Sequence, residues 1–190
     1  MGLPEIFISF QTAAVSAITR SARGMLAVAL KDATEGGAAE AAYKSLAEVP
    51  EDKFSPENYR LLKLAFLAAP TKVWVLRVGE DAEKTYQALE RLRFDWLAAP
   101  GLDDAKVMSF IKTLRNGGRG VKAVVANATA PDCEGIVNLC VSGLTLEDGA
   151  TEAKDYAVRV AALLAALPLT RSATYVNLPE VVGCDALAEP

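Results

Sequence analysis

The sequence predicts an α/β fold in which a mostly parallel or mixed β-sheet is layered with helices and preceded by an extended N-terminal arm. Short apolar runs alternate with segments of 10–16 residues that have helical spacing, which is the pattern of βαβ units with right-handed crossovers. The chain has 190 residues, of which 52% are hydrophobic and 23% charged, and this balance is typical of a globular protein. The length favours one domain, or one domain and an arm.

The first 23 residues are predicted to form the arm and its lead-in, and residues 24–190 the α/β domain. After Pro4, the side chains of Ile6, Ile8 and Phe10 share one face, and this two-residue period predicts a strand at an edge or on a free arm. Residues 12–23 fit a strand and a helix equally well.

Apolar runs and helix-capping residues predict the remaining elements. The predicted strands cover 25–30, 43–49, 72–78, 96–99, 121–126, 136–141 and 173–178. The predicted helices cover about 55–70, 81–92, 103–116 and 151–166. The strand at 72–78 has near-continuous apolar order, as strands buried on both faces do. Ser55 is expected to cap its helix with Pro56 at the first position, and Asp103 is expected to cap the helix that ends at Gly117.

Composition argues against several functional classes. There is no histidine, which removes Ser-His-Asp and Cys-His catalysis and histidine-ligated metals. Cys133, Cys140 and Cys184 lack CxxC spacing, so neither a disulfide framework nor a zinc site is expected, and a reducing compartment fits best. The net charge of −4 argues against a nucleic-acid partner. The longest apolar stretch, Val160–Leu169, is too short to span a bilayer, so no membrane insertion is expected.

The motifs that could carry chemistry have simpler structural interpretations. The glycine-rich stretch 115–120 comes at the end of a predicted helix, where the helix carbonyls are exposed. This negative end of the helix dipole disfavours a phosphate, so the stretch is predicted to be the turn that ends the helix. Cys133 lies between acidic residues that raise a thiol pKa, and Cys140 is expected in the core. Trp74 and Trp96 fall in strands and are expected to pack in the core. We therefore predict no catalytic, cofactor-binding or metal-binding residue, and no enzyme.

The apolar arm is the one unusual feature, because an unpaired strand aggregates unless it pairs with another sheet. Several blocks resemble the prophage-type tail sheath proteins of contractile phage tails. They are GLPEIFISF and AITRSARGMLAVALKD, SLAEVPEDKFSPENYRLLKLAFLAAPTKVWVLRVG, LRFDWLAAPG, VKAVVANATAPDCEGIVNL, and RVAALLAALPLTRSATYVNLPEV. They cover nearly the whole chain in the family's order and spacing.

The resemblance implies a structural subunit whose core has the fold described as subtilisin-like. Such subunits form a helical homo-oligomer around a tail tube, contract to drive the tube through a cell envelope, and meet baseplate proteins. It implies a place in the virion tail after assembly in the bacterial host cytoplasm. The arm would add a strand to a neighbouring subunit, with Leu3, Ile6, Ile8 and Phe10 as anchors. Arg20 and Arg23 are candidates for inter-subunit ion pairs.

Family members continue past the final block into a C-terminal domain and arm, so this chain is expected to be truncated at its C-terminal end. Two other functions stay open from the residues alone. One is a monomeric α/β domain that binds a ligand at the carboxyl ends of its strands. The other is a degenerate, prophage-derived adaptor.

Overall fold

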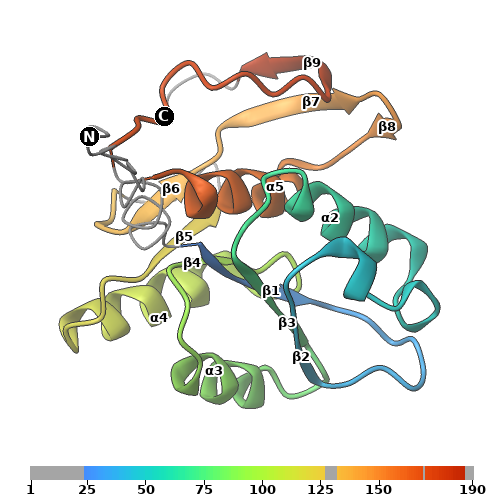
Figure 1. Ribbon diagram of the computed structural model, residues 1–190. Helices are drawn as coiled ribbons and strands as arrows, with labels where there is room; N and C mark the ends of the chain where they lie inside the picture. Colours follow the sequence, from blue (N-terminus) through green and yellow to red (C-terminus); the bar gives the residue numbers. More distant parts are fainter. Residues whose placement is uncertain (1–23, 127–131, 169, 187–190) are drawn as a thin grey trace, which may run out of the picture.

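A computed structural model describes residues 24–126, 132–168 and 170–186 and shows an α/β core with a second, smaller sheet (Figure 1). The strands are β1 (Met25–Leu30), β2 (Glu40–Tyr43), β3 (Lys72–Arg77), β4 (Trp96–Ala98), β5 (Lys122–Val125), β6 (Ile136–Asn138), β7 (Val141–Leu146), β8 (Gly149–Ala150) and β9 (Val181–Ala186). The helices are α2 (Pro56–Phe66), α3 (Ala82–Arg91), α4 (Asp104–Asn116) and α5 (Ala153–Ala166), with 3-10 turns at Leu46–Glu48 and Glu51–Lys53.

The main sheet has six strands in the order β2-β3-β1-β4-β5-β6. Strands β3, β1, β4, β5 and β6 run parallel, and β2 pairs antiparallel with β3 at one edge. The smaller sheet is antiparallel, in the order β8-β7-β9. The predicted mixed sheet with helices is therefore confirmed, while the predicted arm lies outside the described residues.

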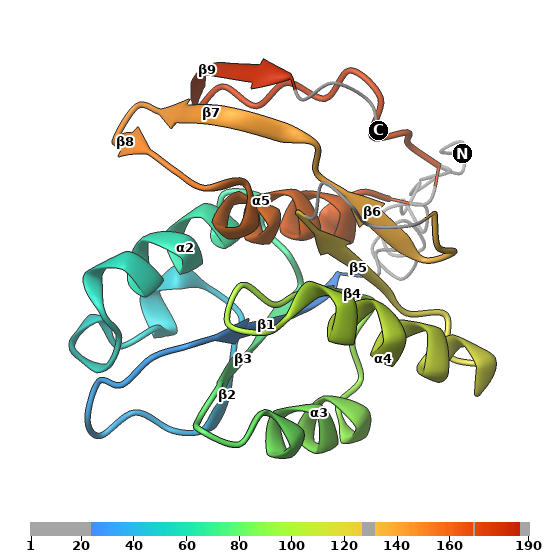
Figure 2. The same ribbon diagram turned by 180° about the vertical axis from the view of Figure 1, so that it is seen from behind.

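Helices cover both faces of the main sheet, with α2 and α5 on one side and α3 and α4 on the other (Figures 1 and 2). Strand β1 supplies both cores, because Leu26, Val28 and Leu30 face α2 and α5 while Ala27 and Ala29 face α3 and α4. All five are at most 1% exposed. Burying a leucine or valine side chain stabilises the fold by about 1.5–3 kcal/mol, so this strand is central to stability.

The helix starts follow the predicted capping residues. The Ser55 hydroxyl accepts a hydrogen bond from Asn58 N (3.2 Å), with Pro56 at the first helical position. The Asp81 and Asp103 carboxylates cap α3 and α4 in the same way. Each cap satisfies a backbone N–H that the helix itself leaves unpaired.

Three predicted strands are wrong in part or whole. Residues 43–49 are not a strand, because β2 ends at Tyr43 and the chain then forms a 3-10 turn that buries Val49 against the core. Residues 136–141 divide between β6 and β7, which belong to different sheets. Residues 173–178 form a turn at 173–175, in which Tyr175 is fully exposed at φ 60°, followed by irregular chain at 176–178. The last strand instead begins at Val181.

Candidate assembly surface

The backbone comes close together at the place where α/β sheets usually bind ligands. Such crevices lie at the carboxyl ends of strands where the order reverses, here between β1 and β4. Gly101 N donates to Ala29 O (3.0 Å), and a Cβ at Gly101 would lie 2.6 Å from Lys31 N. Leu102 is buried beside it. At the reversal point, the backbone that follows β4 therefore packs directly against the end of β1.

A buried ion pair holds the neighbouring loops at the ends of β1 and β3. The side chain of Asp32 is buried and accepts hydrogen bonds from Thr34 N (2.8 Å), Ser55 N (3.0 Å) and Asn58 Nδ2 (2.7 Å). Burial alone would raise the pKa of Asp32, but these hydrogen bonds to the carboxylate outweigh it and hold the pKa well below 3.8. A carboxylate that stays ionised this firmly is suited to anchoring loops and not to proton transfer near neutrality.

The arginine partner completes this anchor. The Arg77 guanidinium lies 3.6 Å from Asp32, donates to Thr34 O (2.7 Å) and to Lys53 O, and stacks 4.8 Å above the ring of Phe54. In the described part of the chain, the side chains of Asp32 and Arg77 therefore hold the loops around them in place.

The smaller sheet lies outside α5, away from the main sheet (Figure 1). Leu144 and Leu146 of β7 turn inward and are buried. Strand β9 pairs only with β7 among the described residues, so its other edge carries backbone groups without a strand partner. Val182 on β9 is 68% exposed. An extended segment could add to this edge.

A buried carboxylate fixes β9 to α5. Glu180, the residue before β9, accepts hydrogen bonds from Arg159 Nε (2.6 Å) and from the Tyr156 hydroxyl (2.9 Å). The side chains of Arg159 and Glu180 are only 7% and 13% exposed. Burial opposes ionisation of Glu180, but hydrogen bonds from its own backbone, Arg159 and Tyr156 lower its pKa below the ordinary 4.5. Burial and the same carboxylate raise the pKa of Tyr156.

A more exposed ion pair fixes the β7–β8 turn to α2. Arg60 binds both carboxylate oxygens of Asp148 at 2.6 Å and also reaches Thr151 Oγ1 at 2.7 Å. The hydrogen bond from Arg60 lowers the pKa of Asp148. Because Asp148 is half exposed, this pair stabilises the turn by at most about 1 kcal/mol.

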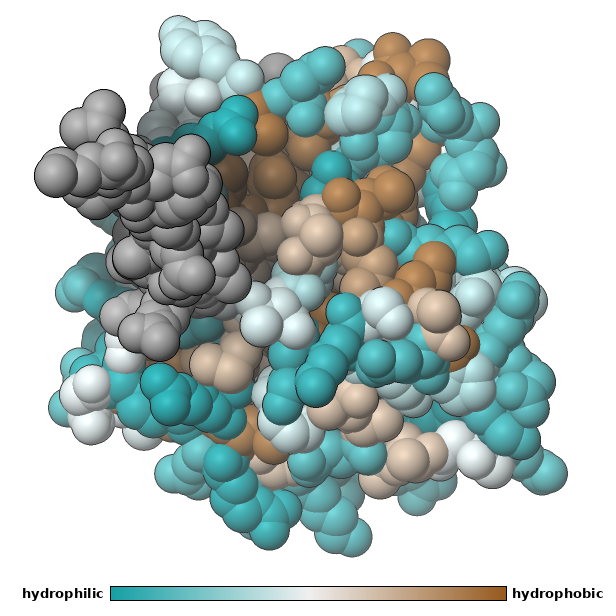
Figure 3. Space-filling view, in the orientation of Figure 1, coloured by the Kyte–Doolittle hydropathy of each residue, from teal (hydrophilic) through white to brown (hydrophobic). Residues whose placement is uncertain are grey.

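Apolar surface gathers around this smaller sheet. Figure 3 shows brown areas in the upper half of the view, over β9 and over the helices beneath it. The exposed large apolar side chains of the described residues are Leu67, Val137, Tyr175 and Val182. Exposed apolar side chains and an unpaired strand edge are both typical of interaction sites, so the region of β9 is the candidate assembly surface.

The predicted site residues are not tested by this geometry. Leu3, Ile6, Ile8, Phe10, Arg20 and Arg23 all lie outside the described residues. Within 24–126, 132–168 and 170–186, no group of three or more His, Cys, Asp or Glu residues could hold a metal ion. No helix in these ranges is long and apolar enough to cross a membrane.

Two further predictions concern Cys140 and the glycine-rich stretch 115–120. Cys140 is exposed and not in the core as predicted, because it lies in the link between β6 and β7 where the chain leaves the main sheet. The glycine-rich stretch is the predicted turn after α4. Arg115 donates to Val121 O and Arg119 to Glu90 O and Leu92 O, so their guanidinium groups are used to hold this turn.

Sequence reasoning missed Arg159, Glu180, Asp32 and Arg77. Arg159 is a charge inside an otherwise apolar helical run, and such a charge predicts a buried partner. Nothing local marks Glu180 as that partner, because it lies 21 residues further along the chain.

Comparisons with known proteins agree on one family. The chain is 34% identical, over 197 aligned residues, to the tail sheath protein of Clostridium phage phiCD119. The match covers 95% of this chain, and the chain spans 53% of that relative's length. No family model matches.

Two solved structures share the fold. A sheath tail protein from Listeria innocua has a TM-score of 0.71 and 17% identity, with 89% of this chain and 64% of that chain covered. A sheath tail protein from Desulfitobacterium hafniense has a TM-score of 0.72 and 16% identity, with coverage of 96% and 66%.

Proposed function

Because 95% of the chain aligns with one tail sheath protein at 34% identity, we propose that it forms part of a structural subunit of the contractile sheath of a phage tail or phage-tail-like particle. The homology is the observation that carries this proposal. The close packing of Gly101 against the backbone at the end of β1 also favours a structural role over ligand binding at that point of the sheet.

The proposed partners follow from this role. Copies of the subunit assemble into a helical homo-oligomer around a tail tube, meet baseplate proteins at one end, and contract to drive the tube through a cell envelope. Assembly takes place in the host cytoplasm, and the product is part of the virion tail. Like its relatives, the protein is a structural component, and we propose that it has no catalytic activity.

The open edge of β9 suggests how neighbouring copies join. The arm of one copy, with Leu3, Ile6, Ile8 and Phe10, would pair with the β9 edge of another, and Arg20 and Arg23 would form ion pairs between copies. Each backbone hydrogen bond contributes about 1 kcal/mol net, while ordering a free chain costs about 1–2 kcal/mol per residue. A single pairing is therefore marginal, and many simultaneous contacts are needed to make the lattice stable.

Negative-stain electron microscopy tests this proposal. The chain, in its natural reading frame, is co-expressed with the cognate tail tube protein. We expect hollow, ridged tubes or stacked rings from the wild type, and folded, dispersed monomers after deletion of residues 1–10. The variant Val182→Lys, at an exposed site on β9, should also block assembly without unfolding the protein.

Two outcomes would contradict the proposal at different levels. Normal tubes from the deletion variant would refute the role of the arm. Dispersed monomers from the complete wild-type reading frame would refute the sheath function itself and favour a prophage-derived adaptor.

A further inference from the structure

Strand β2 leaves one edge of the main sheet open, and the proposed function does not use this edge. The strand pairs with β3 on one side, and no strand of the described residues lies on its other side. Ala39 O accepts a hydrogen bond from Arg77 N (2.9 Å), so the backbone groups of Ala39 and of every second residue after it point toward β3. Those of Glu40 and Ala42 point outward and are unpaired among the described residues. Outward groups of this kind are a template for a further strand.

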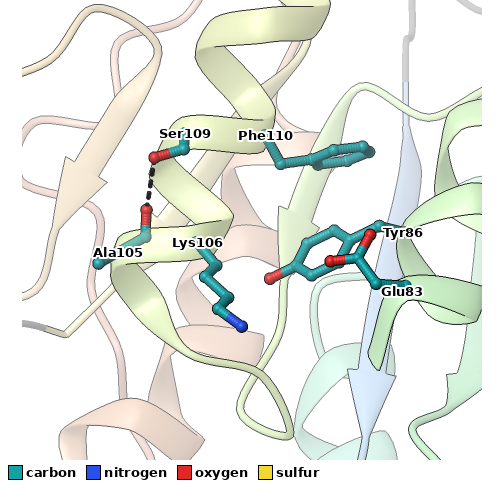
Figure 4. A pocket seen from close by; sticks show the side chains of 6 residues that line it. All are labelled: Glu83, Tyr86, Ala105, Lys106, Ser109 and Phe110. Atoms are coloured by element: carbon teal, nitrogen blue, oxygen red, sulfur yellow. Dashed lines mark hydrogen bonds between the residues drawn. The ribbon is translucent and has the colours of Figure 1, made fainter. Parts of the chain in front are cut away.

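The side chains along this edge are also accessible. Glu40, Ala42 and Lys44, the residue after β2, are exposed, and the two-residue period of a strand places them on one face. This is the α3 side of the sheet, because Ala42 pairs with Trp74, which packs in the core under α3 and α4. Helix α3 itself packs toward α4 through the two aromatic rings drawn in Figure 4, whose centroids lie 5.1 Å apart. A hollow of about 560 Å³ therefore lies between β2 and α3, with Glu40 on its wall.

We propose that the β2 edge pairs with β2 of a second copy of this chain, in a two-fold antiparallel arrangement centred on Ala42. Each Ala42 then lies opposite the Ala42 of the other copy, and the two exchange backbone hydrogen bonds. In the same register each Glu40 lies opposite the Lys44 of the other copy, because both positions are equally far from the centre. Opposite charges directly across an antiparallel pair are stabilising, and any shift of the register leaves them unmatched.

The charges of the edge select a second copy as the partner. Neither Glu40 nor Lys44 forms an ion pair among the described residues, so both side chains are available to another molecule. A lysine on an edge strand disfavours pairing with most other strands. Here the second copy supplies the acidic match for each lysine, so the same feature that repels other strands favours this one.

This contact goes beyond the proposed sheath function and belongs to the free chain. A two-fold contact uses the same surface on both copies, so it closes after two copies and cannot propagate along a tube. Pairing would cover the β2 edge before assembly, when an unpaired edge is a site of aggregation. Because β2 has four residues, the interface is small, and we expect a weak dimer that dissociates on dilution.

Sedimentation velocity of the 190-residue chain, from about 10 µM to about 1 mM, measures the pairing without any tube formation. We expect a reversible equilibrium between monomer and dimer. Glu40→Lys and Lys44→Glu should each weaken dimerisation about tenfold, because like charges then lie opposite each other at both ends of the contact. Mixing the two single variants should restore dimerisation, since each variant then meets the charges that complement its own. Glu147→Lys makes the same change of charge on the smaller sheet and should leave the dimer unaltered.

Hydrogen exchange locates the contact on the strand. In the dilute monomer, the amides of Ala41 and Tyr43, which face β3, should be protected, and the amide of Ala42 should exchange quickly. The Ala42 amide should become protected as the dimer forms.

Three outcomes would overturn the proposal. Absence of a dimer at about 1 mM would refute the pairing itself. A dimer that survives both single charge reversals, or a mixture of the two variants that stays monomeric, would refute the register. Protection that appears in β9, with Ala42 still exchanging quickly, would place the contact between copies on the smaller sheet. None of these results depends on whether the chain builds a sheath.

Discussion

Replacing Glu180 by alanine should strongly destabilise the packing of β9 on α5. The change removes the carboxylate that accepts hydrogen bonds from Arg159 and Tyr156, at 2.6 and 2.9 Å. It leaves the Arg159 charge buried in α5, where one guanidinium nitrogen already lacks a partner among the described residues. Removing one partner of a buried ion pair costs about 3–5 kcal/mol, and this is the loss of unfolding free energy that we expect.

Urea unfolding, monitored by circular dichroism, measures the change in unfolding free energy. Matched control variants separate the effect of losing the charge from the effect of losing side-chain volume. Glu180→Gln keeps the side-chain volume and should cost less, about 1.5–3 kcal/mol, because a neutral acceptor remains. The double variant Arg159→Met with Glu180→Leu removes both charges and should be more stable than Glu180→Ala alone. Hydrogen exchange should show earlier opening of β9 amides than of β1 amides in Glu180→Ala.

The pH dependence of this pair follows from the lowered pKa of Glu180. A carboxylate with a depressed pKa in the folded state contributes stability above its unfolded pKa, here about 4.5, and loses it as the pH falls through the folded value. The stability difference between wild type and Glu180→Gln should therefore be constant above about pH 5 and shrink below pH 4.5. A loss under 1 kcal/mol in Glu180→Ala, or a double variant no more stable than it, would refute the reasoning.

Three further predictions concern the main sheet and α2. Asp32→Asn should lower the unfolding free energy by about 1–3 kcal/mol at pH 7 in urea titrations. Because the pKa of Asp32 is lowered from 3.8, that difference should decline only as the pH falls below about 4. Gly101→Ala should destabilise by more than about 2 kcal/mol, since its Cβ would meet backbone, whereas Gly79→Ala, in open space, should change stability by less than about 0.5 kcal/mol. Ser55→Ala should lower the unfolding free energy by about 1 kcal/mol, seen as a lower melting temperature.

Local signals made most of the main sheet and its helices predictable. The apolar run at β3 and the capping residues Ser55, Asp81 and Asp103 each act within a few residues, so the sequence shows them directly. The 3-10 turn after Tyr43 and the turns before β9 were missed because tertiary packing decides them. Tyr175 is an aromatic residue of high strand propensity that the fold places on an exposed turn.

The contacts that hold the smaller sheet in place could not be predicted from the spacing of residues in the sequence. Glu180 meets Arg159 across 21 residues, and Asp148 meets Arg60 across 88. Arg159 stands out as a charge in an apolar helical run, but Glu180, Arg60 and Asp148 look like ordinary surface residues in the sequence. The sequence pattern did mark the arm as a candidate for assembly, and the pairing of that arm stays a prediction.

The short link between β6 and β7 has a mechanical consequence. Leu139 and Cys140 alone separate the last strand of the main sheet from the first long strand of the smaller one, and Leu139 N still donates to Val125 O (2.8 Å). Tension applied to β7 would therefore pass along the backbone into β6. The parallel hydrogen bonds between β6 and β5 would then be loaded in shear and would share the force. A pull on β9 takes a second route through Glu180 into α5. The two sheets are thus joined by two separate routes, the backbone link after β6 and the Glu180–Arg159 ion pair.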